Sequence, residues 1–223
     1  MIIQRGRIDL YYEKAGAGRP LVMVHGNGED HSIFDKAAGV LKDRFTCFLP
    51  DSRGHGNSSP VNKLHYADMA EDVCFLIEKL DLSDVVLYGY SDGGIIGLLA
   101  ALKCPKVTTL IISGANLTPD GLTEDCLSEI RETYRKTKDP FSRLMLTEPD
   151  LSEEQISQIT ARTLVLAGSE DLVRESETRR IAGAIPGAKL MILEGEDHGS
   201  YICHSDKIAK IIQDFVSVGS ERA

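Results

Sequence analysis

Three side chains of this sequence could together produce a nucleophile. Ser91 stands in Gly-Tyr-Ser-Asp-Gly (89–93), which fits the G-x-S-x-G pattern of a nucleophile elbow, a tight turn between a strand and a helix. A serine hydroxyl needs a general base at neutral pH, and a histidine that is oriented by a carboxylate can supply it. His198 and either Glu170 or Asp171 follow later apolar runs of the chain. The order serine, carboxylate, histidine therefore indicates nucleophilic catalysis.

The histidine and the carboxylate each have a rival. Functional groups of an open parallel sheet gather at the carboxyl ends of its strands. His198 lies closer than His204 to the end of the last apolar run, 188–193, so we predict His198 as the base. Spacing alone does not decide between the adjacent carboxylates Glu170 and Asp171.

The tetrahedral oxyanion of acyl transfer needs two N–H donors that are already aimed at it. The first predicted donor is the backbone N–H of Asp92, the residue after the nucleophile. The second is the N–H of Asn27 in the loop His25-Gly-Asn-Gly28, which follows an apolar run at 21–24. A carboxylate beside an oxyanion would oppose it, so we expect the Asp92 side chain to point away, toward the start of the following helix.

The elements around these residues predict an α/β fold. Short apolar, β-branched runs alternate with stretches of helical spacing, as in a parallel sheet with helices on both faces. The predicted strands are a hairpin within 2–13 and the runs 21–24, 45–49, 84–88, 107–113, 163–167 and 188–193. The predicted helices are 33–41, 65–80, 94–103, 123–134, 174–184 and 206–218, with further segments at 140–146 and from Ser152.

The segment 117–160 interrupts this alternation, because it has helical patterns but no convincing strand. Ser152-Glu-Glu-Gln155 matches a capping box and predicts a helix start. A helical insert between two strands of a parallel sheet lies outside the core. We therefore expect 117–160 to form a cap on a core made of 1–116 and 161–223.

Composition argues against several other classes of protein. A formal charge of −9 is unfavourable for binding nucleic acid or an anionic membrane. No run is long enough to span a membrane, and no glycine-rich nucleotide motif is present. His25, His31 and His65 have no carboxylate at metal-ligand spacing, so we predict no metal and no cofactor. The five scattered cysteines and the absence of a signal peptide predict a cytoplasmic protein with reduced thiols.

Several motifs in this order resemble those of the α/β-hydrolase superfamily over essentially the whole chain. The matching segments are HGNG at 25–28, DSRGHGNS at 51–58, GYSDG at 89–93, GSED at 168–171 and the late His198. The resemblance implies an eight-stranded, mostly parallel sheet with helices on both faces and a short helical cap. It also favours Asp171 over Glu170, because a G-x-x-D pattern after this strand recurs in the family. In the DSRGHGNS segment we predict structural roles, with Asp51 and Arg53 bracing neighbouring loops.

The resemblance implies a serine hydrolase without a cofactor, similar to small lidded esterases and C–C bond hydrolases. We expect a carboxylesterase acting on small acyl esters or thioesters. Lactone hydrolysis, C–C hydrolysis, perhydrolysis and acyl transfer use the same triad and stay open. The cap is short for this branch, which favours small or extended substrates; Phe141, Leu144 and Met145 are candidates for lining the pocket, although core packing explains them equally well.

Two alternatives come from other classes. One is a non-catalytic hydrolase-fold protein that binds a small ligand, but such proteins usually lose a member of the triad. The other is a partner-binding role for the acidic insert, although a charged helix face is usually only solvated. The oligomeric state is not predicted.

Overall fold

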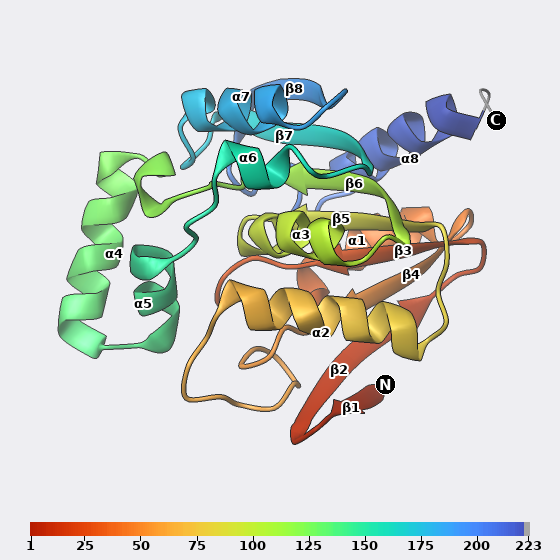
Figure 1. Ribbon diagram of the computed structural model, residues 1–223, viewed down its shortest axis with the longest axis horizontal. Helices are drawn as coiled ribbons and strands as arrows, with labels where there is room; N and C mark the ends of the chain where they lie inside the picture. Colours follow the sequence, from red (N-terminus) through yellow and green to blue (C-terminus); the bar gives the residue numbers. More distant parts are fainter. Residues whose placement is uncertain (221–223) are drawn as a thin grey trace.

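An eight-stranded sheet organises the computed structural model, which describes residues 1–220. The strand order is β1-β2-β4-β3-β5-β6-β7-β8 (Figure 1). The strands are β1 (Ile2–Arg5), β2 (Ile8–Ala15), β3 (Arg19–Val24), β4 (Phe45–Pro50), β5 (Val85–Tyr90), β6 (Val107–Ser113), β7 (Arg162–Glu170) and β8 (Lys189–Asp197). The β1–β2 hairpin is antiparallel at one edge, and the strands from β4 to β8 in this order pair in parallel. The predicted mostly parallel, eight-stranded sheet is confirmed.

Helices cover both faces of this sheet, as Figure 1 shows. The helices of one face are α2 (Tyr66–Lys79), α3 (Asp92–Lys103) and α7 (Glu175–Ala184), and those of the other are η1 (His31–Phe34), α1 (Asp35–Leu41) and α8 (Lys207–Ser220). Along β5, Val85 and Leu87 pack into the first core layer, whereas Val86 and Tyr88 pack into the second. Because successive strand residues point to opposite faces, a strand covered on both sides is apolar without interruption.

Several elements extend beyond their predicted limits, and β7, β8 and α3 show why. Pairing between β7 and β8 continues across a register shift to Glu170 and Asp197, so both strands are longer than their apolar runs. Helix α3 begins at Asp92 instead of Gly94, because the turn at Ser91 leads directly into it. Hydrophobicity shows where a strand is buried, whereas backbone pairing decides where it ends.

The segment 117–160 projects from the sheet as a group of helices (Figure 1). It contains η2 (Pro119–Gly121), α4 (Glu124–Thr137), α5 (Pro140–Thr147) and α6 (Glu153–Ile156). The predicted capping box at Ser152 is present, with the Ser152 and Gln155 side chains each bonded to the other's backbone N–H. Side chains of α4 and α5 form a small apolar cluster together with Leu122 and with Val173, which follows β7.

The division into a core of 1–116 and 161–223 and a cap of 117–160 stays a prediction, and its last residues, 221–223, lie outside the described residues. We call residues 117–160 the cap segment. Within residues 1–220, no helix combines the length and the apolar character needed to cross a membrane.

Candidate active site

Ser91 occupies a sharp turn between β5 and α3. Its backbone has φ 54° and ψ −120°, a left-handed conformation that is unfavourable for a residue with a side chain. The flanking glycines make the turn possible. A Cβ atom on Gly89 would lie 2.0 Å from the Gly93 carbonyl oxygen, and one on Gly93 would lie 2.0 Å from the Val24 carbonyl oxygen. The turn therefore has no room for larger residues two positions before or after Ser91.

His198 joins Ser91 to a buried carboxylate. The distance from His198 Nε2 to Ser91 Oγ is 2.9 Å, and that from His198 Nδ1 to Asp171 Oδ1 is 2.6 Å. The Asp171 side chain is only 2% exposed, and the His198 side chain is 16% exposed. With the proton on Nδ1 facing Asp171, Nε2 is left to accept the Ser91 proton. The sheet thus brings together three residues that are far apart in the sequence.

Asp171 is held in place because its carboxylate also accepts the backbone N–H of Val173 at 2.9 Å. The rival residues, Glu170 and His204, lie away from Ser91. The neighbouring Glu170 is exposed at the end of β7, where its backbone pairs with β8. His204 is also exposed, and its Nδ1 lies 3.2 Å from an oxygen of Asp35.

The two residues predicted as oxyanion donors lie side by side. Within residues 1–220, no protein acceptor is bonded to the backbone N–H of Asn27 or of Asp92. The Asp92 carboxylate accepts a hydrogen bond from Asn27 Nδ2 at 2.7 Å and another from the Tyr66 hydroxyl at 2.8 Å. Burial raises the pKa of Asp92 to about 6, and these two hydrogen bonds oppose the rise. The Asp92 side chain is therefore anchored to its neighbours instead of capping α3.

Glu29 is a residue of this region that sequence reasoning missed. Its carboxylate accepts the backbone N–H of Gly26 at 3.0 Å and the thiol of Cys203 at 3.4 Å. A Cβ atom on Gly26 would lie 2.7 Å from Glu29 Oε2 and 3.1 Å from Ser91 Cβ, so Glu29 fixes the loop beside the nucleophile. Burial raises the pKa of Glu29. Its only sequence signal is its place directly after HGNG.

The segment 51–58 braces loops, as predicted. Arg53 makes two hydrogen bonds to Asp72, of 2.6 and 2.7 Å, and one of 3.1 Å to Asp68 at the start of α2. Asp51 is fully buried and accepts the backbone N–H of His31 and of Asn57. These contacts connect the loop after β4 to α2 and to the loop after β3.

His31 and His65 each contact a carboxylate that the sequence spacing did not indicate. His31 Nδ1 lies 2.7 Å from Asp51 Oδ1, and His65 Nδ1 lies 2.6 Å from Glu148. The carboxylates come from loops distant in the sequence, which spacing could not show. Asp30, His31 and Asp51 could geometrically hold a metal ion, since their ligand atoms lie within 4.8 Å of one another. Each carboxylate also accepts a backbone N–H, so the cluster braces the loops that contain it.

All three candidate pocket residues take part in packing, and Phe141 is partly buried against the main core. Leu144 is 2% exposed and belongs to the main core, and Met145 packs in the apolar cluster of the cap segment. Phe141 lies edge-on to the ring of His55, 4.7 Å between centroids, and His55 in turn lies 5.0 Å from the ring of His25. Of the three, Phe141 is the one whose contacts lead to the loop that holds Asn27.

Known proteins share this architecture. A family model described as the alpha/beta hydrolase fold matches residues 19–143. Serine hydrolase BPHL of Homo sapiens is 24% identical, over 94% of this chain and 83% of that protein. The non-heme chloroperoxidase CPO-A1 of Kitasatospora aureofaciens is 25% identical, over 91% and 93%. The solved structure of the esterase EaEST from Exiguobacterium antarcticum is 25% identical, with a TM-score of 0.84 over 97% of this chain and 98% of that one. Because the family model covers more than half of the chain, this protein belongs to the α/β-hydrolase family and is an enzyme of that family.

Proposed function

We propose that this enzyme is a carboxylesterase that cleaves small acyl esters or thioesters through an acyl-enzyme intermediate. The observation that carries the proposal is the continuous hydrogen-bonded series from Asp171 through His198 to Ser91, at 2.6 and 2.9 Å. An ordinary glycine-rich turn has no reason to bring a buried carboxylate and a histidine to a serine in a strained backbone conformation.

In the first half-reaction Ser91 Oγ attacks the carbonyl carbon of the substrate while its proton passes to His198 Nε2. Asp171 keeps the ring in the required tautomer and stabilises the imidazolium. The backbone N–H groups of Asn27 and Asp92 stabilise the negative oxygen of the tetrahedral intermediate. When the intermediate collapses, His198 returns the proton to the leaving alkoxide or thiolate, and the acyl group stays on Ser91.

In the second half-reaction His198 accepts a proton from water, whose oxygen attacks the acyl carbon. The new tetrahedral intermediate collapses, the carboxylic acid leaves, and His198 returns the proton to Ser91 Oγ. No cofactor enters either step. The similarity to a serine hydrolase and an esterase supports hydrolysis, and the choice of small acyl esters rests on the short cap segment.

A second candidate uses the same acyl-enzyme with hydrogen peroxide in place of water. The similarity to a protein named a non-heme chloroperoxidase favours testing it. The proposal also includes a cytoplasmic location, which the five free cysteines of the structure support.

A fluorophosphonate probe tests the proposal, together with hydrolysis of p-nitrophenyl esters of increasing chain length. We expect the wild-type enzyme to be labelled and to hydrolyse the short esters, and Ser91→Ala and His198→Ala to lose both properties. His204→Ala is the matched control, because this histidine is exposed and is expected to be dispensable. A folded wild-type enzyme that is neither labelled nor active on any ester would contradict the proposal.

A further inference from the structure

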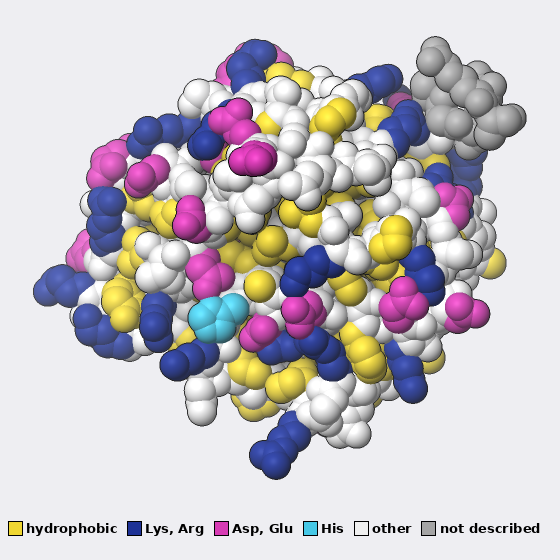
Figure 2. Space-filling view, in the orientation of Figure 1, with side chains coloured by type: hydrophobic (Ala, Val, Ile, Leu, Met, Phe, Trp, Pro, Cys, Tyr) yellow, Lys and Arg dark blue, Asp and Glu magenta, His cyan; other side chains and the backbone are white. Residues whose placement is uncertain are grey.

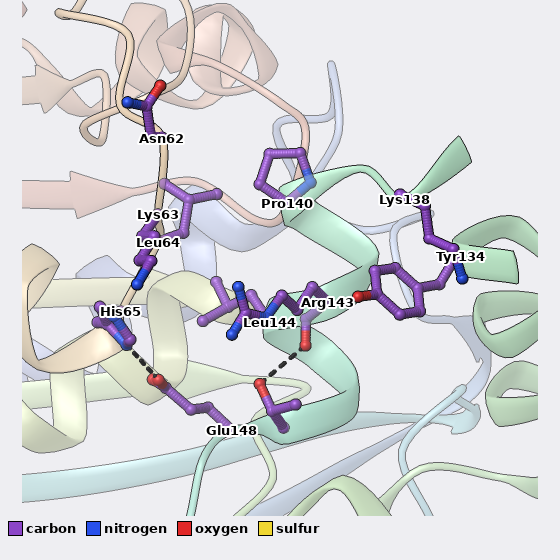
Figure 3. Close-up of a pocket in the computed structure, with 11 residues that line it drawn as sticks. Asn62, Lys63, Leu64, His65, Tyr134, Lys138, Pro140, Arg143, Leu144 and Glu148 are labelled. Atoms are coloured by element: carbon purple, nitrogen blue, oxygen red, sulfur yellow. Dashed lines mark hydrogen bonds and ion pairs between the residues drawn. The ribbon is translucent and has the colours of Figure 1, made fainter. Parts of the chain in front are cut away.

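A pocket lies where the cap segment meets the core. It has a volume of about 170 Å³ and is formed by α4, α5 and residues 62–65, which precede α2. Arg143 extends from α5 toward the strip of chain that holds Leu64 and His65, with Tyr134 and Lys138 on the far side (Figure 3). None of the lining residues belongs to the proposed triad or to the two predicted oxyanion donors, and Leu144 is the one candidate substrate-pocket residue among them.

Three cationic side chains line the pocket. Lys63 comes from the core, and Lys138 and Arg143 come from the cap segment. Within residues 1–220, none of the three side chains forms an ion pair or a hydrogen bond, although the Lys138 ammonium lies over the Tyr134 ring at 4.8 Å from its centroid. All three residues are exposed, and like charges that line one hollow repel one another.

This gathering of positive charge contrasts with the composition of the cap segment. Residues 117–160 carry ten acidic and five basic side chains, which leaves a formal charge of −5. On the outer side of α4, Arg131 and Lys136 are paired with glutamates. Figure 2 shows Lys and Arg side chains near a histidine on this face, with Asp and Glu side chains also beside it. The acidic segment therefore leaves Lys138 and Arg143 unpaired at the pocket.

The pocket also contains one carboxylate, Glu148, which is already engaged. One of its oxygens lies 2.6 Å from His65 Nδ1, and the other accepts the backbone N–H of Tyr66 at 3.0 Å. These bonds fix the end of α5 against the start of α2. With both oxygens bonded at one end of the pocket, Glu148 does not pair with any of the three cations.

We propose that this pocket binds a small anion with several oxygen atoms, of the phosphate or carboxylate class. The anion bridges Lys63 of the core to Arg143 of the cap segment, with Lys138 adding positive charge at the rim, and thereby fastens the cap segment to the core. The guanidinium of Arg143 can donate two parallel hydrogen bonds to such a group. A volume of about 170 Å³ has room for one phosphate or a small organic acid.

Inorganic phosphate is the first probe, added to the whole enzyme at constant ionic strength in a buffer without oxyanions. Calorimetric titration gives the Kd, and thermal unfolding gives the change in Tm. We expect phosphate to bind and to raise the Tm of the wild type, because a ligand that binds only the folded state stabilises it. Arg143→Gln and Lys63→Gln should each weaken binding about tenfold or more, since hydrogen bonds between charged groups are strong.

Arg135→Gln is the matched control. It removes the same charge from an exposed position of α4 that does not line the pocket, so its phosphate affinity should equal that of the wild type. Glycerol phosphate and succinate then identify the source of the oxygen atoms: a response to the first alone assigns a phosphoryl group, and a response to the second alone assigns a carboxylate.

Two results would overturn the proposal. One is the absence of binding by all three anions at millimolar concentration. The other is an equal effect of phosphate on the wild type and on the Arg143, Lys63 and Arg135 variants, which would show a non-specific ionic effect. Neither result depends on ester hydrolysis, so a failure here is distinguishable from a failure of the proposed esterase activity.

Discussion

Asn27 Nδ2 donates a hydrogen bond of 2.7 Å to Asp92 Oδ2, which links the loop after β3 to the first residue of α3. The Tyr66 hydroxyl bonds to the other oxygen of the same carboxylate. The side chains thus join the two residues whose backbone N–H groups we propose as oxyanion donors. Preorganised donors need no rearrangement during the reaction, and this link supplies a physical basis for preorganisation.

The burial of Asp92 predicts a pH-dependent difference in stability for Asp92→Asn. Because the pKa of Asp92 is raised to about 6 in the folded protein, its protonated form favours folding. This stabilisation of the folded state is fully present below about pH 4, the pKa of an unfolded aspartate, and is lost as the pH rises through about 6. The change is roughly 3 kcal/mol. Asparagine does not titrate. In urea unfolding, the unfolding free energy of Asp92→Asn relative to that of the wild type should therefore rise by about that amount between pH 4 and pH 8.

Tyr66→Phe gives the companion measurement. Its lost hydrogen bond should raise the pKa of Asp92 further, so the stability loss of this variant should occur at higher pH than in the wild type. A stability difference between Asp92→Asn and the wild type that is the same at every pH would contradict the prediction.

The strained backbone of Ser91 predicts that glycine is more stable than alanine at this position. A left-handed conformation costs a residue with a side chain of order 1 kcal/mol, and glycine avoids that cost. Ser91→Gly should therefore be about 1 kcal/mol more stable than Ser91→Ala in urea unfolding, although both variants should be inactive toward p-nitrophenyl acetate. An alanine variant at least as stable as the glycine variant would show that the turn is not strained.

The elbow glycines predict a sharp contrast between two glycine-to-alanine substitutions. At Gly93 the new methyl group would meet the Val24 carbonyl oxygen at 2.0 Å, so Gly93→Ala should lose about 2 kcal/mol or more of unfolding free energy. At Gly183, in α7, nothing lies within 4 Å of the added methyl group, and Gly183→Ala should gain about 0.5 kcal/mol from helix propensity. Equal effects at the two positions would argue against the close approach at the elbow.

Asp171→Asn should show that Asp171, and not the adjacent Glu170, is the carboxylate that supports catalysis. The amide can donate its N–H to His198 Nδ1 and so favour the tautomer that cannot accept the Ser91 proton. We expect kcat for p-nitrophenyl acetate to fall by about 10³- to 10⁴-fold, with KM little changed. Glu170→Gln is the control and should retain wild-type kcat. A large loss in that variant instead would reassign the carboxylate.

Several features could be predicted from the sequence because they depend on local geometry. The alternating burial of β5 appears in the sequence as an unbroken apolar run, the capping box at Ser152 as a four-residue pattern, and the elbow as two glycines around Ser91. Each involves residues that are close together in the sequence. The periodicity of apolar residues and steric fit restrict the backbone conformations of such short segments strongly. The element order and the fold could therefore be predicted from them.

Other features depend on how distant loops pass one another. Glu29 beside Ser91, His31 against Asp51, and Glu148 bound to His65 join segments whose separation in the sequence says nothing about their separation in space. The extra residues of β7 and β8 likewise depend on pairing between strands, and not on hydrophobicity.

The sequence by itself determined the parallel sheet, the position of the nucleophile turn and the choice of residue types that could act together. Only the tertiary structure decided that Asp171 faces His198 while Glu170 faces solvent, and that the Asp92 carboxylate is bonded to Asn27 and Tyr66. The physical reason is that side-chain direction at the end of a strand changes with each residue. Which direction is productive depends on the partner that the rest of the fold brings to it.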